Sequence, residues 1–522
     1  MRGSQFIGSK RSAKSDHTFS PANNAGSKFY EATTAEIDEA ASKAYEAFLV
    51  YRNLSGYTKA NFLEKIANGI EAARTSLLQA AMQETFLAEA RLNGEINRTV
   101  NQIKSFAELL KEGSWVKAII DTAQPERQPL PRPGIRQMQK PIGVIGVFGA
   151  SNFPFAFSTA GGDTISALAA GCTVVYKAHP AHPGLSEMVA QIIIDASQKT
   201  SMPDGVFSMI QAASVEPALD LVNHPLIKAI AFTGSFKAGR SIYDVAAKRE
   251  EPIPVYAEMG STNPVFILPE ILKQKGDEIA KALAASNLLS AGQFCTNPGI
   301  IIANKNTATE NFQKVFSSCI GEANGDTMLT VSIFNAYDQS TKKIAALNEV
   351  NMMSKGNTGE KQSAAAPFMF TVSTDAFISN HELQEEVFGP SSLHITAGNK
   401  DDLMKIATSL TGQLTITIWG TEKDISDHSE LINYLELKAG RIIINGVPTG
   451  VEVTHAMMHG GPYPATTDSK FTSVGTTAIY RFTRPVCYQN FNDAVLPEAL
   501  QNKNPLNIMR MINGEFTKNT LE

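Results

Sequence analysis

Hydrophobic and polar positions follow two different rhythms along the chain. From about residue 35 to residue 112, alanine, leucine and charged residues recur at helical spacing, which predicts consecutive amphipathic helices. The segment 124–134, QPERQPLPRPG, contains four prolines and ends this rhythm. We expect an exposed strand directly after it, at about 135–139.

Beyond residue 140, short apolar runs alternate with helical segments. The runs IGVIGVFG, CTVVYKA, GVFSMIQ and AIAFTGS begin at residues 142, 172, 205 and 229. A second series has PVFIL near 264, GIIIANK near 299, LTITIWG near 414 and GRIIING near 440. Uniformly apolar strands separated by helices are typical of parallel sheets that are covered on both faces. The pattern therefore predicts an α/β protein with two doubly wound domains.

The stretch 141–162 contains no charged residue and is long enough to span a membrane. Pro154 and five glycines interrupt it, and Ser151 and Asn152 place polar groups at its centre. A buried strand followed by a turn and a helix start fits this pattern better than a membrane span.

Length and charge narrow the class of protein. The chain has 522 residues, which at roughly 100 to 200 residues per domain corresponds to two to four domains. Its 46 basic and 51 acidic residues give a net charge of −5, which disfavours a nucleic-acid partner. Hydrophobic residues make up 43% and charged residues 19%, as in folded globular proteins.

Cysteine usage indicates a reducing compartment. The cysteines form no CxxC pair and no cluster with histidines at metal-ligand spacing, so we expect neither disulfides nor a metal site. The N-terminus has no apolar core of a secretory signal. We therefore expect a cytoplasmic protein with four free thiols: Cys172, Cys295, Cys319 and Cys487.

Two features at predicted strand ends could bind a phosphorylated cofactor. The turn from Gly234 through Ser235 to Gly239 connects a strand to a helix, where free N–H groups and the helix dipole attract anions. Its spacing is not GxGxxG, so an ordinary tight turn is the alternative interpretation. Lys177 ends the strand CTVVYK and is either a ribose or phosphate ligand or a solvated lysine.

Three further residues could carry chemistry. Cys295 lies in a predicted loop, and a thiol there needs an electropositive setting or a base to act as a nucleophile. Glu258 ends a strand and could activate a water as general base. Asn152 is either satisfied within a turn or donates to a ligand oxygen. A buried structural thiol, a salt-bridged glutamate and a turn asparagine are the alternatives.

Together these segments resemble the aldehyde dehydrogenase superfamily. Six motifs occur in order along the chain: SNFP, VVYKAHP, FTGSFKAG, AEMGSTNP, GQFCTNPG and EEVFGP. The similarity extends from FIGSKRSAKSDHTFSPAN near the start to RFTRPVCYQN near the end, so it covers nearly the whole chain.

The resemblance implies the roles of the site residues. Cys295 is the nucleophile that forms a thiohemiacetal and then a thioester, and Glu258 is the general base for hydrolysis of the thioester. Asn152 and the Cys295 N–H hold the oxyanion, and hydride passes to NAD or NADP. The resemblance implies no metal, and it assigns these cofactor contacts: Lys177, Gly234, Ser235, Gly239, Glu386 and Phe388.

The resemblance also implies an organisation of the chain and an assembly. It assigns 1–119 and 141–257 to a Rossmann-like cofactor domain, and 258–460 to a catalytic domain. Residues 120–140 are the first part of a small strand element that mediates oligomerisation, and 461–522 form a C-terminal segment with the rest of it. A homodimer or homotetramer follows from this arrangement, with no membrane contact.

Departures from the common family motifs indicate which branch of the family the chain resembles. KAHPAHPG, AEMGSTNPVF and HGGPYPATT are similar to the 2,5-dioxopentanoate (α-ketoglutarate semialdehyde) dehydrogenase branch. Pro180 stands where many members carry a glutamate that accepts the ribose hydroxyls, which removes one obstacle to NADP.

Three alternatives stay open at this stage. An aliphatic or fatty aldehyde is the other substrate class, and it requires an apolar tunnel instead of a cationic one. A catalytically silent nucleotide-binding oligomer is a second alternative. A cysteine hydrolase or acyltransferase without nicotinamide is the third, and it requires a histidine beside Cys295, which the sequence cannot place among His179, His182, His455 and His459.

Overall fold

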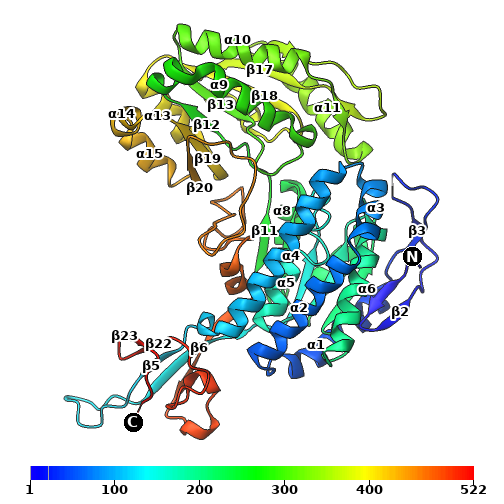
Figure 1. Ribbon diagram of the computed structural model, residues 1–522, viewed down its shortest axis with the longest axis vertical. Helices are drawn as coiled ribbons and strands as arrows, with labels where there is room; N and C mark the ends of the chain where they lie inside the picture. The colour runs from blue at the N-terminus through cyan, green and yellow to red at the C-terminus, as the bar shows by residue number, and fades with distance from the viewer. Residues whose placement is uncertain (1, 22, 522) are drawn as a thin grey trace.

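The computed structural model describes residues 2–21 and 23–521, so positions 1, 22 and 522, which fall within the first and last predicted segments, lie outside the described residues. Figure 1 shows two α/β bodies, one above the other, and a strand-rich arm that projects from the lower one. The two bodies are built on seven-stranded sheets and the arm on a five-stranded sheet. The predicted α/β class with two doubly wound domains and a small strand element is confirmed.

The first sheet has the order β11-β10-β7-β8-β9-β1-β2. The five strands β7 to β11 are parallel to one another. β1 extends the sheet by pairing antiparallel with β9. The strand bounds are β1 Gln5–Ile7, β2 Lys10–Ser12, β7 Val144–Phe148, β8 Thr173–Ala178, β9 Phe207–Gln211, β10 Ile227–Thr233 and β11 Val255–Glu258.

Helices cover both faces of this sheet. One apolar cluster joins it to α2 through α6, and a second joins its other face to α1, α7 and α8. The helices are α1 Thr34–Tyr51, α2 Gly56–Ala72, α3 Arg74–Thr85, α4 Glu89–Glu112, α5 Gly162–Ala170, α6 Pro183–Lys199, α7 Glu216–Asn223 and α8 Phe236–Ala247.

The helix α4 shows how the sequence pattern positions charged groups. Leu92, Ile96, Ile103 and Phe106 recur at helical spacing and are fully buried in the core. The helix ends at Gly113, whose φ of +83° suits a residue without Cβ. Because the apolar face is fixed in the core, the charged residues in the first half of α4 have a fixed direction as well.

The second sheet has the order β15-β17-β18-β13-β12-β19-β20 and is parallel except for β15. Apolar clusters lie on both of its faces. Its strands are β12 Val265–Ile267, β13 Ile300–Asn304, β15 Asn351–Lys355, β17 Phe368–Ser373, β18 Ser391–Ala397, β19 Gln413–Trp419 and β20 Ala439–Ile444. Its helices are α9 Pro269–Leu288, α10 Thr307–Glu322, α11 Val331–Ala345, α12 Thr374–Ser379, α13 Lys400–Ser409, α14 Glu422–Asp427 and α15 Ser429–Leu435.

The arm is formed by segments far apart in the sequence. Its sheet has the order β21-β6-β5-β22-β23, with β5 Ile119–Asp121, β6 Ile135–Pro141, β21 Thr483–Gln489, β22 Arg510–Ile512 and β23 Glu515–Thr517. The expected strand after the proline-rich segment is β6. Two further two-stranded antiparallel sheets pair β3 Thr18–Phe19 with β4 Phe29–Tyr30, and β14 Asp326–Thr327 with β16 Ala364–Ala365.

The uncharged stretch 141–162 forms β7, a loop and the start of α5, as predicted. Within residues 2–21 and 23–521, none of the helices combines the length and the apolar character that crossing a bilayer requires.

Candidate active site

The site lies at the carboxyl edge of the first sheet. Phe148 at the end of β7 is in register with Lys177 on β8 and with Phe232 on β10, and Thr233 is in register with Glu258 on β11. The ends of four adjacent parallel strands therefore meet at one edge, where open α/β sheets bind ligands.

A returning chain segment completes this edge. After β20 the chain comes back to the first sheet, where Met259 N donates to Ala465 O at 2.8 Å and Glu258 forms an isolated antiparallel bridge with Thr466. The backbone of 465–467 therefore lies beside β11. This pairing brings the residues that precede and follow it, His459 and Ser473, to the Glu258 carboxylate.

Cys295 lies in a loop of constrained backbone between η2 (Leu289–Gly292) and β13. Ser290, Ala291 and Gly292 have φ of +52°, +54° and +64°. The Asn263 side-chain amide donates to the carbonyl oxygens of Cys295, at 2.8 Å, and of Asn297, at 2.9 Å. A left-handed run held by a buried amide fixes the direction of the thiol.

Glu258, Cys295 and His459 form a compact group. His459 Nε2 lies 2.9 Å from Glu258 Oε1 and 3.5 Å from Cys295 Sγ. The exposed fraction is 4% for Glu258 and 1% for His459. Ser473 Oγ donates to the other carboxylate oxygen of Glu258. The thiol therefore faces a carboxylate that already accepts two hydrogen bonds.

Burial and charge set opposite pKa directions in this group. Burial alone would raise the pKa of Glu258, but the charge of His459 and the hydrogen bonds from His459, Ser473 and Cys295 hold it below its ordinary value. Burial and the carboxylates of Glu258 and Glu386 raise the pKa of the Cys295 thiol well above its ordinary value. The arrangement favours an ionised carboxylate beside a neutral thiol, so the carboxylate stays available as a base.

The same three residues are the group that could hold a metal ion among the described residues. Their donor atoms lie within 4.8 Å of one another. The sequence analysis expected no metal, because the three residues are far apart along the chain. Two of the three donor atoms, His459 Nε2 and Glu258 Oε1, are hydrogen-bonded to each other, so a metal would have to replace that bond.

Asn152 lies next to the Cys295 loop. Its Nδ2 donates to the carbonyl oxygen of Gln293 at 3.2 Å, and the residue is 9% exposed. The amide is thus bonded to the Cys295 loop at Gln293, two residues before the thiol in sequence. This position suits a donor to an oxyanion on the Cys295 adduct.

Four of the predicted cofactor residues lie at or shortly after the ends of β8 and β10, the two strands that flank β7. Lys177 is half-buried, and burial lowers the pKa of its ammonium to about 8. Gly234 and Ser235 are exposed just before α8, and Ser235 caps that helix. Gly239 packs so close to Met259 that a Cβ would lie 2.8 Å from its sulfur. An exposed helix N-terminus and a nearby ammonium fit the phosphate and ribose groups of a nucleotide.

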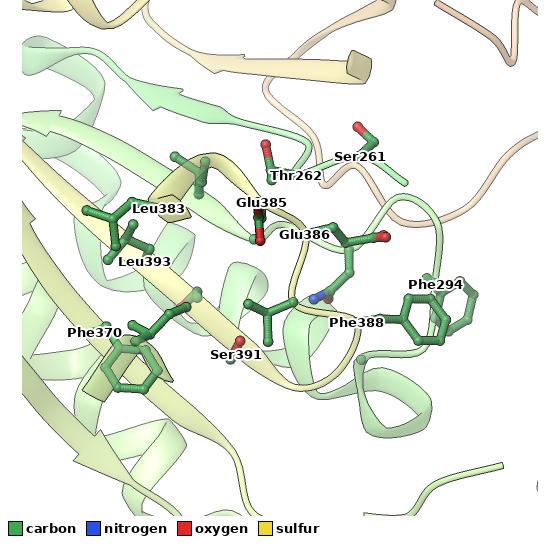
Figure 2. A pocket seen from close by; sticks show the side chains of 17 residues that line it. Ser261, Thr262, Phe294, Phe370, Leu383, Glu385, Glu386, Phe388, Ser391 and Leu393 are labelled. Atoms are coloured by element: carbon green, nitrogen blue, oxygen red, sulfur yellow. The ribbon is translucent and has the colours of Figure 1, made fainter. Parts of the chain in front are cut away.

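Glu386 and Phe388 line a cavity of the catalytic body together with Thr262 and Phe294 (Figure 2). In Figure 2, Phe294 and Phe388 lie at one end of this cavity, and Phe370, Leu383 and Leu393 gather at the other. Glu386 Oε2 approaches Gly260 so closely that no side chain fits there. Burial raises the pKa of Glu386 to about 7.

The structure therefore brings Cys295, Glu258 and Asn152 together, with Lys177, Gly234, Ser235 and Gly239 at or shortly after the ends of β8 and β10 and with Glu386 and Phe388 in the cavity. Sequence reasoning did not locate His459 beside the thiol, nor did it name Ser473. His459 is the first residue of the motif HGGPYPATT and Ser473 follows it, and the departure of this motif from the common family pattern was the available signal.

Comparison with known proteins gives a consistent result. A model of the aldehyde dehydrogenase family matches residues 9–480. The chain is 45% identical over 99% of both chains to alpha-ketoglutaric semialdehyde dehydrogenase of Acinetobacter baylyi. It is 44% identical to alpha-ketoglutaric semialdehyde dehydrogenase 2 of Azospirillum brasilense, over 93% of each chain.

Solved structures share the fold at low sequence identity. Betaine aldehyde dehydrogenase from Staphylococcus aureus in complex with NAD+ superimposes with a TM-score of 0.79 at 18% identity, covering 93% of this chain and 94% of that one. An aldehyde dehydrogenase from Physcomitrella patens in complex with the reaction product succinate gives 0.78 at 19% identity, with coverage of 94% and 99%.

Proposed function

The chain belongs to the aldehyde dehydrogenase family and is an oxidoreductase, and on this premise we propose that it oxidises 2,5-dioxopentanoate to 2-oxoglutarate with NAD or NADP. The observation that carries the substrate is the near-complete alignment with the Acinetobacter baylyi enzyme. The geometry of Cys295, Glu258 and His459 supports the reaction type, because a thiol, a base and a histidine meet at one point.

The first steps belong to Cys295 and its neighbours. The Cys295 thiol releases its proton to solvent, and the thiolate attacks the aldehyde carbon to give a thiohemiacetal, while Glu258 stays ionised through its bonds to His459 and Ser473. Asn152 Nδ2 exchanges its bond to Gln293 for one to the developing oxyanion. A bound nicotinamide would supply the hydride acceptor that turns the thiohemiacetal into a thioester on Cys295.

Hydrolysis of the thioester needs a second proton transfer. Glu258 takes a proton from an incoming water, and its hydrogen bond with His459 Nε2 holds the ionised carboxylate in place beforehand. The presence of a histidine near the thiol is also what the hydrolase alternative required. In an aldehyde dehydrogenase the same pair serves the hydrolytic half of the reaction.

Lys177, the N-terminus of α8, Glu386 and Phe388 are the residues that we propose to bind the cofactor. Lys177 would contact the adenine ribose, and the first turn of α8 after Gly234 would receive the diphosphate. Glu386 would hold the nicotinamide ribose beside the Cys295 loop. Pro180 contributes no carboxylate at the adenine ribose, which leaves room for a 2′-phosphate.

The arm supports an oligomeric assembly and is the element that we propose to mediate it. β21 pairs with β6 on one edge only, and the arm and the segment between β21 and β22 expose the apolar residues Phe491, Val495 and Phe516. An unpaired strand edge of this length is a template for another strand. A homodimer or homotetramer in the cytoplasm is the expected state, which light scattering of the purified protein would measure.

The decisive experiment follows the absorbance of the reduced nicotinamide. The protein is mixed with 2,5-dioxopentanoate or with hexanal, each with NAD and with NADP. We expect a higher kcat/KM for 2,5-dioxopentanoate than for hexanal. A preference for hexanal would assign a fatty-aldehyde dehydrogenase instead, and no reduction by folded protein that binds nucleotide would indicate a silent oligomer.

A further inference from the structure

Three charged side chains project from one side of α4 in its first half. Arg91, Glu95 and Arg98 are spaced by four and three residues, so they share one face of the helix. The Glu95 carboxylate accepts hydrogen bonds from the backbone of Phe155 at 2.8 Å and of Ala156 at 2.9 Å. This face of α4 therefore lies against the loop that carries Asn152.

Arg91 is held by its neighbours. Its Nη2 donates to the carbonyl oxygen of Asn152 at 2.6 Å, and its guanidinium lies 5.2 Å from the ring centre of Phe153 and 4.7 Å from that of Phe294. One terminal nitrogen is thus used to position Asn152. Arg91 Nη1 is buried without a partner among the described residues, so one of its two terminal nitrogens is unpaired.

Arg98 differs in what its terminal nitrogens contact. Its Nε donates to the carbonyl oxygen of Val451 at 3.3 Å, and its guanidinium lies 5.1 Å from the ring centre of Phe157. Both Nη1 and Nη2 are buried, and neither has a hydrogen-bond partner among the described residues. A buried guanidinium with both terminal nitrogens unpaired is costly, and an anion that accepted two hydrogen bonds from it would offset that cost.

The position of Arg98 relative to the thiol follows from a short chain of contacts. The Phe157 ring that it covers has its centre 6.1 Å from that of the His459 ring, and His459 Nε2 lies 3.5 Å from Cys295 Sγ. Burial lowers the pKa of Arg98, while the charges of Glu95, Cys295 and Glu258 oppose that effect. The guanidinium charge is therefore felt at the reacting centre.

Like Arg91 and Arg98, Arg441 is close enough to Cys295 for the two groups to interact through their charges. Its Nη1 and Nη2 donate to the carbonyl oxygens of Gly450, at 3.1 Å, and of Pro448, at 2.8 Å. Its fork is already occupied by the backbone. Of these three arginines, Arg98 alone keeps both terminal nitrogens available.

We propose that Arg98 binds the carboxylate of an oxo-acid aldehyde through its two terminal nitrogens while the aldehyde carbon lies at Cys295. This inference rests on the proposed function and adds the residue that selects a carboxylate-bearing substrate. A guanidinium fork matches a carboxylate with two parallel hydrogen bonds. Four carbon–carbon bonds of about 1.5 Å separate the two ends of 2,5-dioxopentanoate, a reach of roughly 5 Å.

Because Nη1 and Nη2 are buried, the Arg98 guanidinium must reorient to meet the substrate carboxylate. Its Nε keeps the hydrogen bond to the Val451 carbonyl oxygen during this turn. The Arg98 side chain is partly exposed although its terminal nitrogens are buried. The turn exchanges contact with the Phe157 ring for contact with the carboxylate. The charges of Arg91, Glu95 and Arg98 sum to +1, which one substrate carboxylate neutralises.

The test compares two aldehydes of equal carbon number, 2,5-dioxopentanoate and pentanal, on wild type, Arg98→Met and Arg98→Lys. We expect Arg98→Met to lower kcat/KM for 2,5-dioxopentanoate by about 100- to 1000-fold and to leave pentanal within about 3-fold. Arg98→Lys keeps the charge without the fork and is expected to give an intermediate loss.

Arg441→Met is the matched control, because it also removes a buried guanidinium near Cys295 but one whose fork is already bonded. It should change both aldehydes by the same factor. Equal losses for both aldehydes in Arg98→Met would overturn the carboxylate role. Inhibition by 2-oxoglutarate gives a second readout, and its inhibition constant should rise by a similar factor in Arg98→Met only.

The outcome separates this inference from the proposed function. If wild type oxidises pentanal and does not prefer 2,5-dioxopentanoate, the proposed substrate fails regardless of Arg98. If wild type prefers 2,5-dioxopentanoate and Arg98→Met keeps that preference, the substrate stands and the role of Arg98 is wrong.

Discussion

The two sides of Cys295 differ in how their polar groups are satisfied. On one side, Glu258 has both oxygens hydrogen-bonded, to His459 and to Ser473. On the other, Arg98 keeps two buried nitrogens without a partner among the described residues. The satisfied side is preorganised for proton transfer, which every aldehyde needs. The unsatisfied side can be completed only by a ligand, so it is where substrates are distinguished.

The largest expected effect comes from removing the Cys295 sulfur, which lies between the two sides. Cys295→Ala should lower the turnover of 2,5-dioxopentanoate and of pentanal alike by at least about 10⁴-fold, because no nucleophile remains. Nucleotide affinity, measured by calorimetry, should stay within about 2-fold of wild type. Wild-type turnover in this variant would contradict the mechanism.

The next largest effect is expected for Glu258→Gln, which removes the hydrogen-bonded carboxylate on the first side. It should lower steady-state kcat by about 100- to 1000-fold for both aldehydes, with a retained burst of reduced nicotinamide, because hydrolysis of the thioester loses its base. Stopped-flow absorbance measures the burst and the steady rate in one trace. A loss of the burst with unchanged hydrolysis would assign Glu258 to thiol activation alone.

The same variant should act in the opposite direction on the free thiol. The Glu258 charge helps to raise the pKa of Cys295, so the thiolate fraction of the wild type is small at neutral pH and grows as the pH rises. Glu258→Gln removes that charge and should increase the rate of alkylation by iodoacetamide at pH 7 several-fold. Mass spectrometry of the Cys295 peptide measures the rate.

His459→Asn should have a smaller effect, about 10- to 100-fold on kcat/KM, equal for both aldehydes. His459 helps to keep the pKa of Glu258 low, so its loss raises that pKa. The ionised carboxylate then disappears at a higher pH as the solution is acidified. The acid limb of the pH profile should therefore move to higher pH, whereas a purely structural role of His459 would leave it in place.

The last prediction concerns the cofactor site, which lies outside this comparison and should not affect the choice between the two aldehydes. Lys177→Met should weaken nucleotide binding by about 10-fold, or about 1.4 kcal/mol, and leave the ratio of the two aldehydes unchanged. Lys248→Met, an exposed lysine at the other end of α8, serves as control. Unchanged nucleotide affinity in Lys177→Met would remove Lys177 from the cofactor site.

The sequence predicted the parts of the molecule that depend on local pattern. The strands β7, β8, β9 and β10 are apolar runs, and each was expected. β17 and β18 were not, since β18 carries Ser391, Ser392 and His394 as buried polar residues within its run. Their burial depends on neighbouring strands and helices, which no local pattern reports.

The candidate site likewise has residues that local motifs identify and residues whose place depends on packing. Cys295, Glu258 and Asn152 lie in motifs that the resemblance identifies, and the structure brings them together. His459 and Arg98 reach the thiol from segments 164 residues after it and about 200 before it, and only the packing of α4 and of the returning segment places them there. Long-range placement of single polar side chains is what sequence reasoning lacked.

The three reacting residues also lie on three different chain segments. Glu258 ends the first sheet, Cys295 belongs to the second body, and His459 lies on the segment that returns from the second body to the first. Neither body alone contains a nucleophile with its base. During refolding, we therefore expect catalytic activity to return only once the two bodies have docked, so the regain of activity would report on that docking.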